Sequence, residues 1–118
     1  MNTVNLDELV HQKPRDNYPY AASAQVFHTD QVFLYSEEVA PGEQSSAPHY
    51  HKKIDEVILV MEGELTAFEG DRSTKLKSGD TLLFKANSQE LHYLKNESQT
   101  KARFLLFRAS SNTSDVEY

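Results

Sequence analysis

The sequence contains no cysteine, which excludes disulfide bonds and thiolate metal sites. It has no apolar run near the roughly 20 residues of a membrane-spanning helix, and its N-terminus lacks the basic start and apolar stretch of a signal peptide. Basic residues are also scarce: 12 against 18 acidic residues give a net charge of -6, which argues against nucleic acid or a membrane as a partner. We therefore expect a cytoplasmic protein, in which a locally basic pocket for an anionic small molecule is still allowed.

The length of 118 residues suffices for one domain with a single core. From residue 24 onward, short apolar runs alternate with turn signals, a pattern typical of an all-β sandwich, barrel or jelly roll. We predict an N-terminal arm over residues 1–24 with one helical turn, a barrel over 25–108 and a flexible C-terminal tail over 109–118. The expected strands cover residues 25–28, 32–39, 49–51, 56–62, 64–69, 73–76, 80–84, 92–95 and 102–108.

Three of the expected strands are apolar on both faces, in the runs 57–61, 81–84 and 104–107. An antiparallel strand with one face in water alternates apolar and polar residues, so the second face of these strands needs a cover. Either the N-terminal arm folds back over this face or a second subunit covers it. Because a chain of this size has little material to spare, we predict a homodimer.

Two histidines and a glutamate form the most informative pattern of the chain. His49 and His51 are two positions apart on an expected strand, so both imidazoles point to the same face. A hairpin after this strand would bring the carboxylate of Glu56 back beside them. His92 offers a third imidazole at the start of another strand. Imidazole nitrogens and one carboxylate suit a divalent first-row metal.

The residues around this pattern resemble the first sequence motif of the cupin superfamily. The segment from Gly42 to Gly63 is similar to G(x)5HxH(x)3–4E(x)6G, with one extra residue between Gly42 and His49. A second segment, from Gly79 to Asn96, resembles the motif G(x)5PxG(x)2H(x)3N in its first glycine and its final spacing. The resemblance extends over about residues 25–108, and its form is that of a small single-domain bacterial cupin.

The second motif departs from the pattern at three points. Lys85 and Asn87 stand where the motif has proline and glycine, and two additional residues precede His92. Asparagine adopts a positive φ more readily than most residues, so Asn87 can replace the glycine without great strain. Because of the two-residue offset, Glu90 is a rival to His92 as the fourth metal ligand.

The resemblance implies a double-stranded β-helix, which is a jelly-roll barrel open at one end. It also implies one divalent metal ion near the opening, zinc, iron, manganese or nickel, held by His49, His51, Glu56 and His92. The other histidines, His11 and His28, have no partner pattern and are expected to be exposed to solvent. The pair Glu37-Glu38 and the acidic tail are interpreted as solubilising charge.

Two classes of function remain open from the sequence. The first is a metal-dependent enzyme, oxygenase-like or isomerase-like, acting on a small molecule inside the barrel, with Glu56 as ligand or catalytic base. The second is a non-catalytic cupin that binds a small ligand or a metal. A perturbed acid or base beside the metal would favour the enzyme, whereas a purely apolar lining would favour the binder.

Overall fold

The computed structural model describes residues 1–111 and 113–118, and its regular secondary structure is almost entirely β-strand. Among these described residues, the one helical element is a 3-10 turn at Leu6–Glu8, within the segment where the sequence predicts a helical turn. The strands are β1 (Ala22–His28), β2 (Val32–Val39), β3 (Tyr50–His51), β4 (Glu56–Glu62), β5 (Glu64–Glu69), β6 (Arg72–Lys77), β7 (Thr81–Phe84), β8 (His92–Lys95), β9 (Ala102–Ala109) and β10 (Val116–Glu117).

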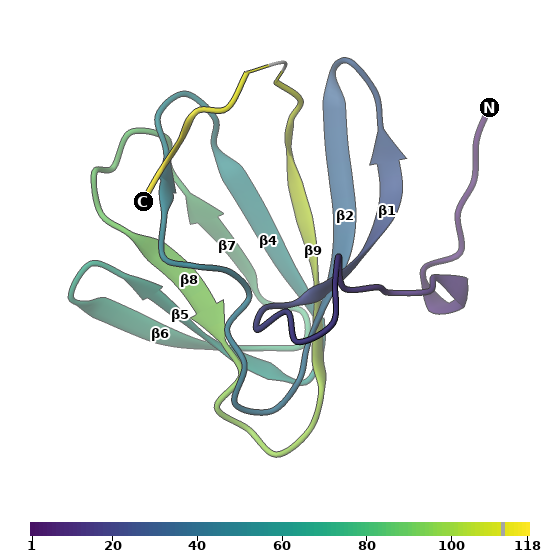
Figure 1. Cartoon of the computed structure of the whole chain (residues 1–118), viewed down its shortest axis with the longest axis horizontal. Helices are drawn as coiled ribbons and strands as arrows, with labels where there is room; N and C mark the ends of the chain where they lie inside the picture. The colour runs from purple at the N-terminus through teal and green to yellow at the C-terminus, as the bar shows by residue number, and fades with distance from the viewer. Residues whose placement is uncertain (112) are drawn as a thin grey trace.

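The strands form a double-stranded β-helix built from two opposed layers, as the sequence predicts. One layer is a five-stranded antiparallel sheet in the order β1-β2-β9-β4-β7. The other contains the three-stranded sheet β6-β5-β8 and the short pair β10-β3. Figure 1 shows the strands converging at one end and spreading at the other, so the barrel is open on one side. Strand β9 lies at the centre of the large sheet, between β2 and β4.

The space between the layers is filled by apolar side chains that alternate along the strands. On β4, Ile58 and Val60 point inward and are almost completely buried. Val57, the residue before Ile58, points outward and is exposed. This alternation is what the two-residue period of a strand dictates. The core cluster comprises Ala21, Val39, Ile58, Val60, Leu65, Ala67, Leu76, Phe84, Leu94, Ala102 and Phe104.

Two positions with positive φ close turns that the sequence motifs mark. Gly63 has φ +77°, and a Cβ there would lie 2.8 Å from the carbonyl oxygen of Lys101, so only glycine fits between β4 and β5. Asn87 has φ 58°, which confirms that asparagine takes the role of the missing motif glycine. Its backbone N–H donates to the carbonyl oxygen of His51 at 2.6 Å. The turn before β8 is therefore tied directly to the histidine strand.

Asn96, the last residue of the second motif, is fully buried and has a structural role. Its Nδ2 donates to the carbonyl oxygens of Val39 (2.9 Å) and Thr100 (2.8 Å). Its Oδ1 accepts from the backbone N–H of Ser98 at 2.9 Å. All its amide groups are thus satisfied, as burial of an amide requires. This side chain fixes the β8–β9 connection against the end of β2.

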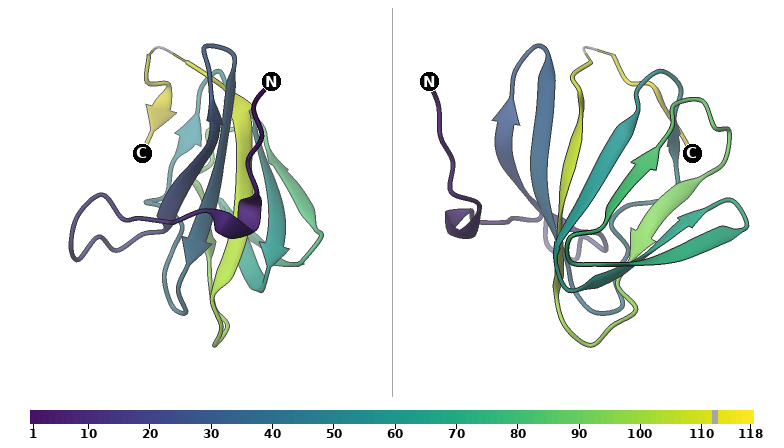
Figure 2. Two further views of the ribbon diagram at one scale, coloured as in Figure 1. Left: turned by 90° about the vertical axis from the view of Figure 1, so that its right-hand side faces the viewer. Right: turned by 180° about the vertical axis from the view of Figure 1, so that it is seen from behind.

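The N-terminal arm runs outside the barrel, beside the edge of the large sheet at β1 (Figure 2), and contacts outward-facing side chains of β2 and β9. The Nη1 of Arg103 on β9 donates to the carbonyl oxygen of Leu6 at 3.1 Å. Further along the arm, Nε2 of His11 lies 2.8 Å from Oγ of Ser36 on β2, and the His11 side chain is only 4% exposed. The expectation that His11 faces solvent is therefore wrong, whereas His28 is exposed as predicted.

The burial of His11 makes the docking of the arm sensitive to pH. Burial lowers the pKa of His11 from 6.5, and Glu38 only partly opposes this effect. The unfolded chain therefore binds a proton that the folded protein resists, so the free energy of unfolding falls as the pH drops below about 6.5. We expect His11→Gln, which can still reach Ser36, to lose less stability than the wild type between about pH 7.5 and about pH 5.5. Urea denaturation at the two pH values measures this difference, and identical losses in both proteins would contradict it.

The arm leaves another part of the outer face uncovered. Val57, Leu83 and Phe107 lie on the outer face of β4, β7 and β9 and are 38%, 48% and 46% exposed. The strand register places Val57 opposite both Leu83 and Phe107, so the three side chains form one apolar patch.

No helix among the described residues is long and apolar enough to cross a membrane.

Candidate metal centre

The histidine pair lies on the short strand β3 and the residue before it. His49 and His51 alternate to the same face, as the sequence predicts, and their ring centroids are 5.3 Å apart. The backbone of His49 also pairs with that of His92 at the start of β8, through hydrogen bonds of 3.2 and 2.8 Å. This pairing sets a third imidazole beside the other two, with ring centroids of His49 and His92 4.7 Å apart.

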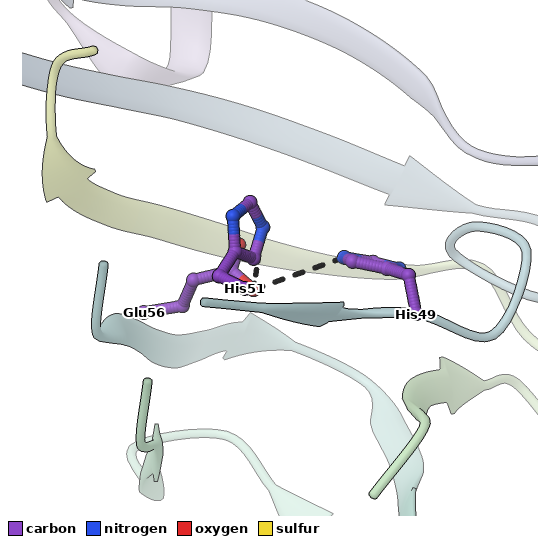
Figure 3. A group of neighbouring side chains, drawn as sticks. All are labelled: His49, His51 and Glu56. Atoms are coloured by element: carbon purple, nitrogen blue, oxygen red, sulfur yellow. Dashed lines mark ion pairs between the residues drawn. The ribbon is translucent and has the colours of Figure 1, made fainter. Parts of the chain in front are cut away.

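Glu56 approaches the histidines from the opposite sheet. The hairpin expected from the sequence is wrong in one respect: β3 pairs with β10, while β4 lies between β9 and β7. The turn over residues 52–55 instead crosses between the layers. Glu56 then begins β4 and returns its side chain toward the imidazoles, as Figure 3 shows for His49 and His51. The site is therefore held by both layers of the barrel.

One carboxylate oxygen lies within reach of all three imidazoles. Oε1 of Glu56 is 3.0 Å from Nε2 of His92, 3.2 Å from Nε2 of His51 and 3.8 Å from Nε2 of His49. His49, His51 and Glu56 each offer a ligand atom within 4.8 Å of the others, so these three residues could hold a metal ion. Glu56, His51 and His92 are all buried.

The contacts of the Nδ1 atoms of His49 and His51 indicate that the site suits a divalent cation. Nδ1 of His49 lies 2.8 Å from the carbonyl oxygen of Ala47, which can only accept, so Nδ1 carries the proton. Nδ1 of His51 lies 2.7 Å from Oδ1 of Asp115. In each neutral ring the lone pair is then on Nε2, which faces Glu56. Lone pairs and a carboxylate that meet at one point need a positive charge between them.

The pKa values express the same need for positive charge. Burial alone would raise the pKa of Glu56, but its contacts with His51 and His92 outweigh burial and lower the pKa to about 2. Burial would lower the pKa of His51, yet the carboxylates of Glu56 and Asp115 together raise it. The pKa of His49 is lowered, chiefly by burial. Glu56 is thus held ionised, and a bound cation would take the place of the protons on the imidazoles.

The structure brings His92, and not Glu90, to the histidine pair. The Glu90 carboxylate forms an ion pair with Arg72 at 3.1 Å, beside the β5–β6 turn, and its side chain is 43% exposed. His92 instead stacks on Phe84 with parallel rings 3.9 Å apart and reaches Glu56 through Nε2. The two extra residues before His92 therefore lengthen the loop without displacing the histidine.

Asp115 is a site residue that the sequence analysis missed. It lies in the segment expected to be a flexible tail, yet Val116–Glu117 pairs with β3. Its Oδ1 contacts Nδ1 of His51, and its Oδ2 accepts from the backbone N–H of Lys53 at 3.0 Å. A single apolar residue, Val116, between acidic neighbours is a weak signal for a strand, so the contact could not be found from the pattern alone.

We expect Asp115→Asn to weaken metal binding by about 10- to 100-fold, because a carboxylate partner orients a metal-binding imidazole and increases its basicity. Glu117→Gln is the matched control: it lies in the same segment but pairs with Lys52, away from the imidazoles. Isothermal titration of the metal-free proteins with zinc measures both affinities. Equal affinities for Asp115→Asn and wild type would show that the carboxylate has no part in metal binding.

The imidazoles line a cavity of about 190 Å³ inside the open end of the barrel. Its wall includes a second carboxyl group, Glu37 on β2, together with the cation of Arg108 and the aromatic rings of Phe33 and Phe84. Burial and the nearby charge of Glu56 raise the pKa of Glu37 to about 8. The interpretation of Glu37 as solubilising charge is therefore wrong, while its neighbour Glu38 does lie outside, 3.0 Å from Lys101.

The fold and the site define a small β-barrel protein with a candidate metal centre at its open end. Residues 35–108 match the family described as Cupin domain, and the chain belongs to this family. No curated protein is similar enough in sequence to be counted as a relative.

Solved structures of low sequence identity share the fold. A cupin-superfamily sugar phosphate isomerase from Silicibacter pomeroyi has 23% identity and a TM-score of 0.86, over 99% of this chain and 81% of that one. A Klebsiella pneumoniae protein with a double-stranded β-helix domain has 21% identity and a TM-score of 0.79, over 99% and 96% of the two chains. The polyketide cyclase RemF from Streptomyces resistomycificus has 21% identity and a TM-score of 0.78, over 94% and 80%.

Proposed function

We propose that this protein is a metal-dependent enzyme that acts on a small molecule inside the barrel by isomerase-like proton transfer. In this proposal His49, His51, Glu56 and His92 hold one divalent ion: zinc, iron, manganese or nickel. When bound, such an ion would act as a Lewis acid that polarises a substrate oxygen. The names of two neighbours in structure, a sugar phosphate isomerase and a polyketide cyclase, are consistent with small-molecule chemistry in this fold.

The observation that carries the proposal is the Glu37 carboxyl group in the same cavity. An enzyme needs a protonatable group beside the metal, whereas a simple binder does not. With a pKa raised to about 8, Glu37 is a much stronger base than an ordinary carboxylate. A cation bound nearby would lower this pKa toward neutrality, where a group can both accept and donate a proton.

The division of roles between the two glutamates follows from their surroundings. Glu56 is held ionised by the imidazoles and serves as a ligand. Glu37 is half-buried and shares its cross-strand row with the buried side chains of Phe104 and Val60, where the charged form is poorly solvated. Glu37 as carboxylate would remove a proton from a carbon next to the polarised oxygen and return it to the neighbouring atom. A group of this kind serves proton transfer directly, so we favour the isomerase-like reaction over the dioxygenase-like one.

Deuterium exchange tests the proposal on many candidate substrates at once. The metal-loaded protein is incubated in D₂O with a panel of small α-hydroxycarbonyl compounds, and incorporation of deuterium at carbon is followed by NMR. We expect one or more compounds to exchange with the metal-loaded protein and none with the metal-free protein. If no compound exchanges while metal binding is stoichiometric, the non-catalytic alternative holds.

We also propose that the protein is a homodimer, as the sequence predicts, and that it is cytoplasmic. The patch of Val57, Leu83 and Phe107 supports the dimer, because contiguous apolar surface is rarely left in water. We expect the wild type to sediment at twice the 13.5 kDa of one chain and Phe107→Thr to sediment at 13.5 kDa. Lys75→Thr, an exposed change on β6, serves as control and should leave the mass unchanged. A wild-type mass of one chain would contradict the dimer.

A further inference from the structure

Arg108 lies beside the candidate metal centre in one cross-strand row of the large sheet. The register sets Phe33 opposite Arg108, Arg108 opposite Glu56 and Glu56 opposite Phe84, across β2, β9, β4 and β7. Directly opposite residues share a face of the sheet, and all four side chains line the cavity. A guanidinium group, a candidate metal ligand and two aromatic rings therefore border the same space.

The charge of Arg108 is not neutralised by the protein. Its guanidinium carbon lies 3.8 Å from the ring centroid of Phe33, and its Nη1 donates to the carbonyl oxygen of Ala109 at 3.1 Å. The cross-strand neighbour Glu56 is engaged by the imidazoles instead. Within residues 1–111 and 113–118, Arg108 forms no ion pair with a carboxylate. Because a guanidinium group has five N–H bonds, most of its donors are available to a ligand in the cavity.

The other charges of the cavity do not offset this cation once a divalent ion is bound. Even when ionised, Glu37 contributes one negative charge, which only balances the charge of Arg108. Glu56 contributes one negative charge, which is smaller than the charge of the proposed ion. The cavity is then positive in a protein whose net charge is -6. Such a local field favours an anion over a neutral ligand of the same shape.

We propose that Arg108 binds the anionic group, a carboxylate or a phosphate, of the small molecule that the cavity takes. The planar fork of a guanidinium group matches both groups through two parallel hydrogen bonds. The ring of Phe33 beneath the guanidinium restrains it in one orientation, so less freedom is lost on binding. Anchored there, the ligand would extend along the row toward Glu56 and the histidines. This inference extends the proposed function by naming the class of its substrate.

Anion titrations of the metal-free protein test the inference directly. Inorganic phosphate and acetate are titrated separately, and backbone amide signals of β2 and β9 are followed by NMR. We expect saturable shifts near Arg108 and a loss of affinity of about tenfold or more in Arg108→Gln, because a charge-assisted hydrogen bond is removed. Arg108→Lys keeps the charge but not the fork and should bind with intermediate affinity. Arg72→Gln, on a side chain 70% exposed near the β5–β6 turn, is the matched control and should bind like wild type.

The pattern of affinities identifies the anionic group. Tighter binding of phosphate supports a phosphate ester as ligand, and equal or tighter binding of acetate supports a carboxylate. Absence of saturable binding by either anion, or equal affinity in Arg108→Gln and wild type, overturns the inference. The readout needs neither metal nor turnover, so it is independent of the deuterium-exchange test. Anion binding through Arg108 in a protein that catalyses no exchange would support the anion site and contradict only the proposed enzymatic function.

Discussion

Replacing His51 by alanine is expected to abolish stoichiometric metal binding while leaving the barrel folded. The imidazole is the most constrained of the three, with Nδ1 on Asp115 and Nε2 on Glu56. Its loss removes one ligand and also removes the contact that connects Asp115 to the site. The fold should persist because the apolar core around Val60 and Leu94 supplies the stability, in contrast to a zinc finger, which unfolds without its metal.

Metal analysis of purified His51→Ala and wild type, together with circular dichroism, measures both parts of this expectation. His28→Ala is the control, because His28 is exposed and lies in contact with Tyr35 rather than with the other histidines. The wild type and the control should bind one ion per chain. Retention of one ion per chain in His51→Ala, His49→Ala and Glu56→Ala alike would show that the metal centre is elsewhere or absent.

Replacing Glu37 by glutamine is expected to slow deuterium exchange by about 100- to 10,000-fold with metal binding unchanged, because it removes only the acid–base group. Glutamine is nearly isosteric with the protonated carboxyl group that the cavity favours, so packing against Phe104 should be preserved. Glu38→Gln is an unusually close control: it is the next residue on the same strand, but its side chain lies on the outer face beside Lys101.

Rates of exchange per bound metal ion, measured for both variants, decide the role of Glu37. Full activity in Glu37→Gln would assign the proton transfer to another group and leave Glu56 as the remaining candidate base. A parallel loss of metal in Glu37→Gln would instead make Glu37 part of the metal centre. In either case the proposed role of Glu37 as the acid–base group is wrong.

The fold and the centre of the site could be predicted because both depend on short-range patterns. Short apolar runs separated by turn signals located nine strands, and the two-residue spacing of His49 and His51 fixed their common face. Asn87 could be assigned a positive φ from the chemistry of its side chain. These inferences need only neighbours along the chain and the geometry of a strand.

The remaining site residues depend on which face of a strand points inward, and on contacts between distant segments. Glu37 and Glu38 are identical as residues, and only the register of β2 against β9 decides that the first lines the cavity. The contact of His51 with Asp115 spans 64 residues. His11 is buried because the arm docks on Ser36, which no local pattern specifies. Such features follow from tertiary structure and leave little trace in one sequence.

The central place of β9 has a consequence for how the protein is made. In the part of the chain that the structure describes, the large sheet consists of two antiparallel pairs, β1-β2 and β4-β7, which β9 joins. Strand β9 spans Ala102–Ala109, so a ribosome synthesises it after all the strands that it must connect. Until then β2 and β4 each present an unpaired edge, which is a surface prone to pairing with other chains. The large sheet can therefore close only after β9 emerges, and the histidines of the candidate metal centre meet Glu56 only in the closed barrel that follows.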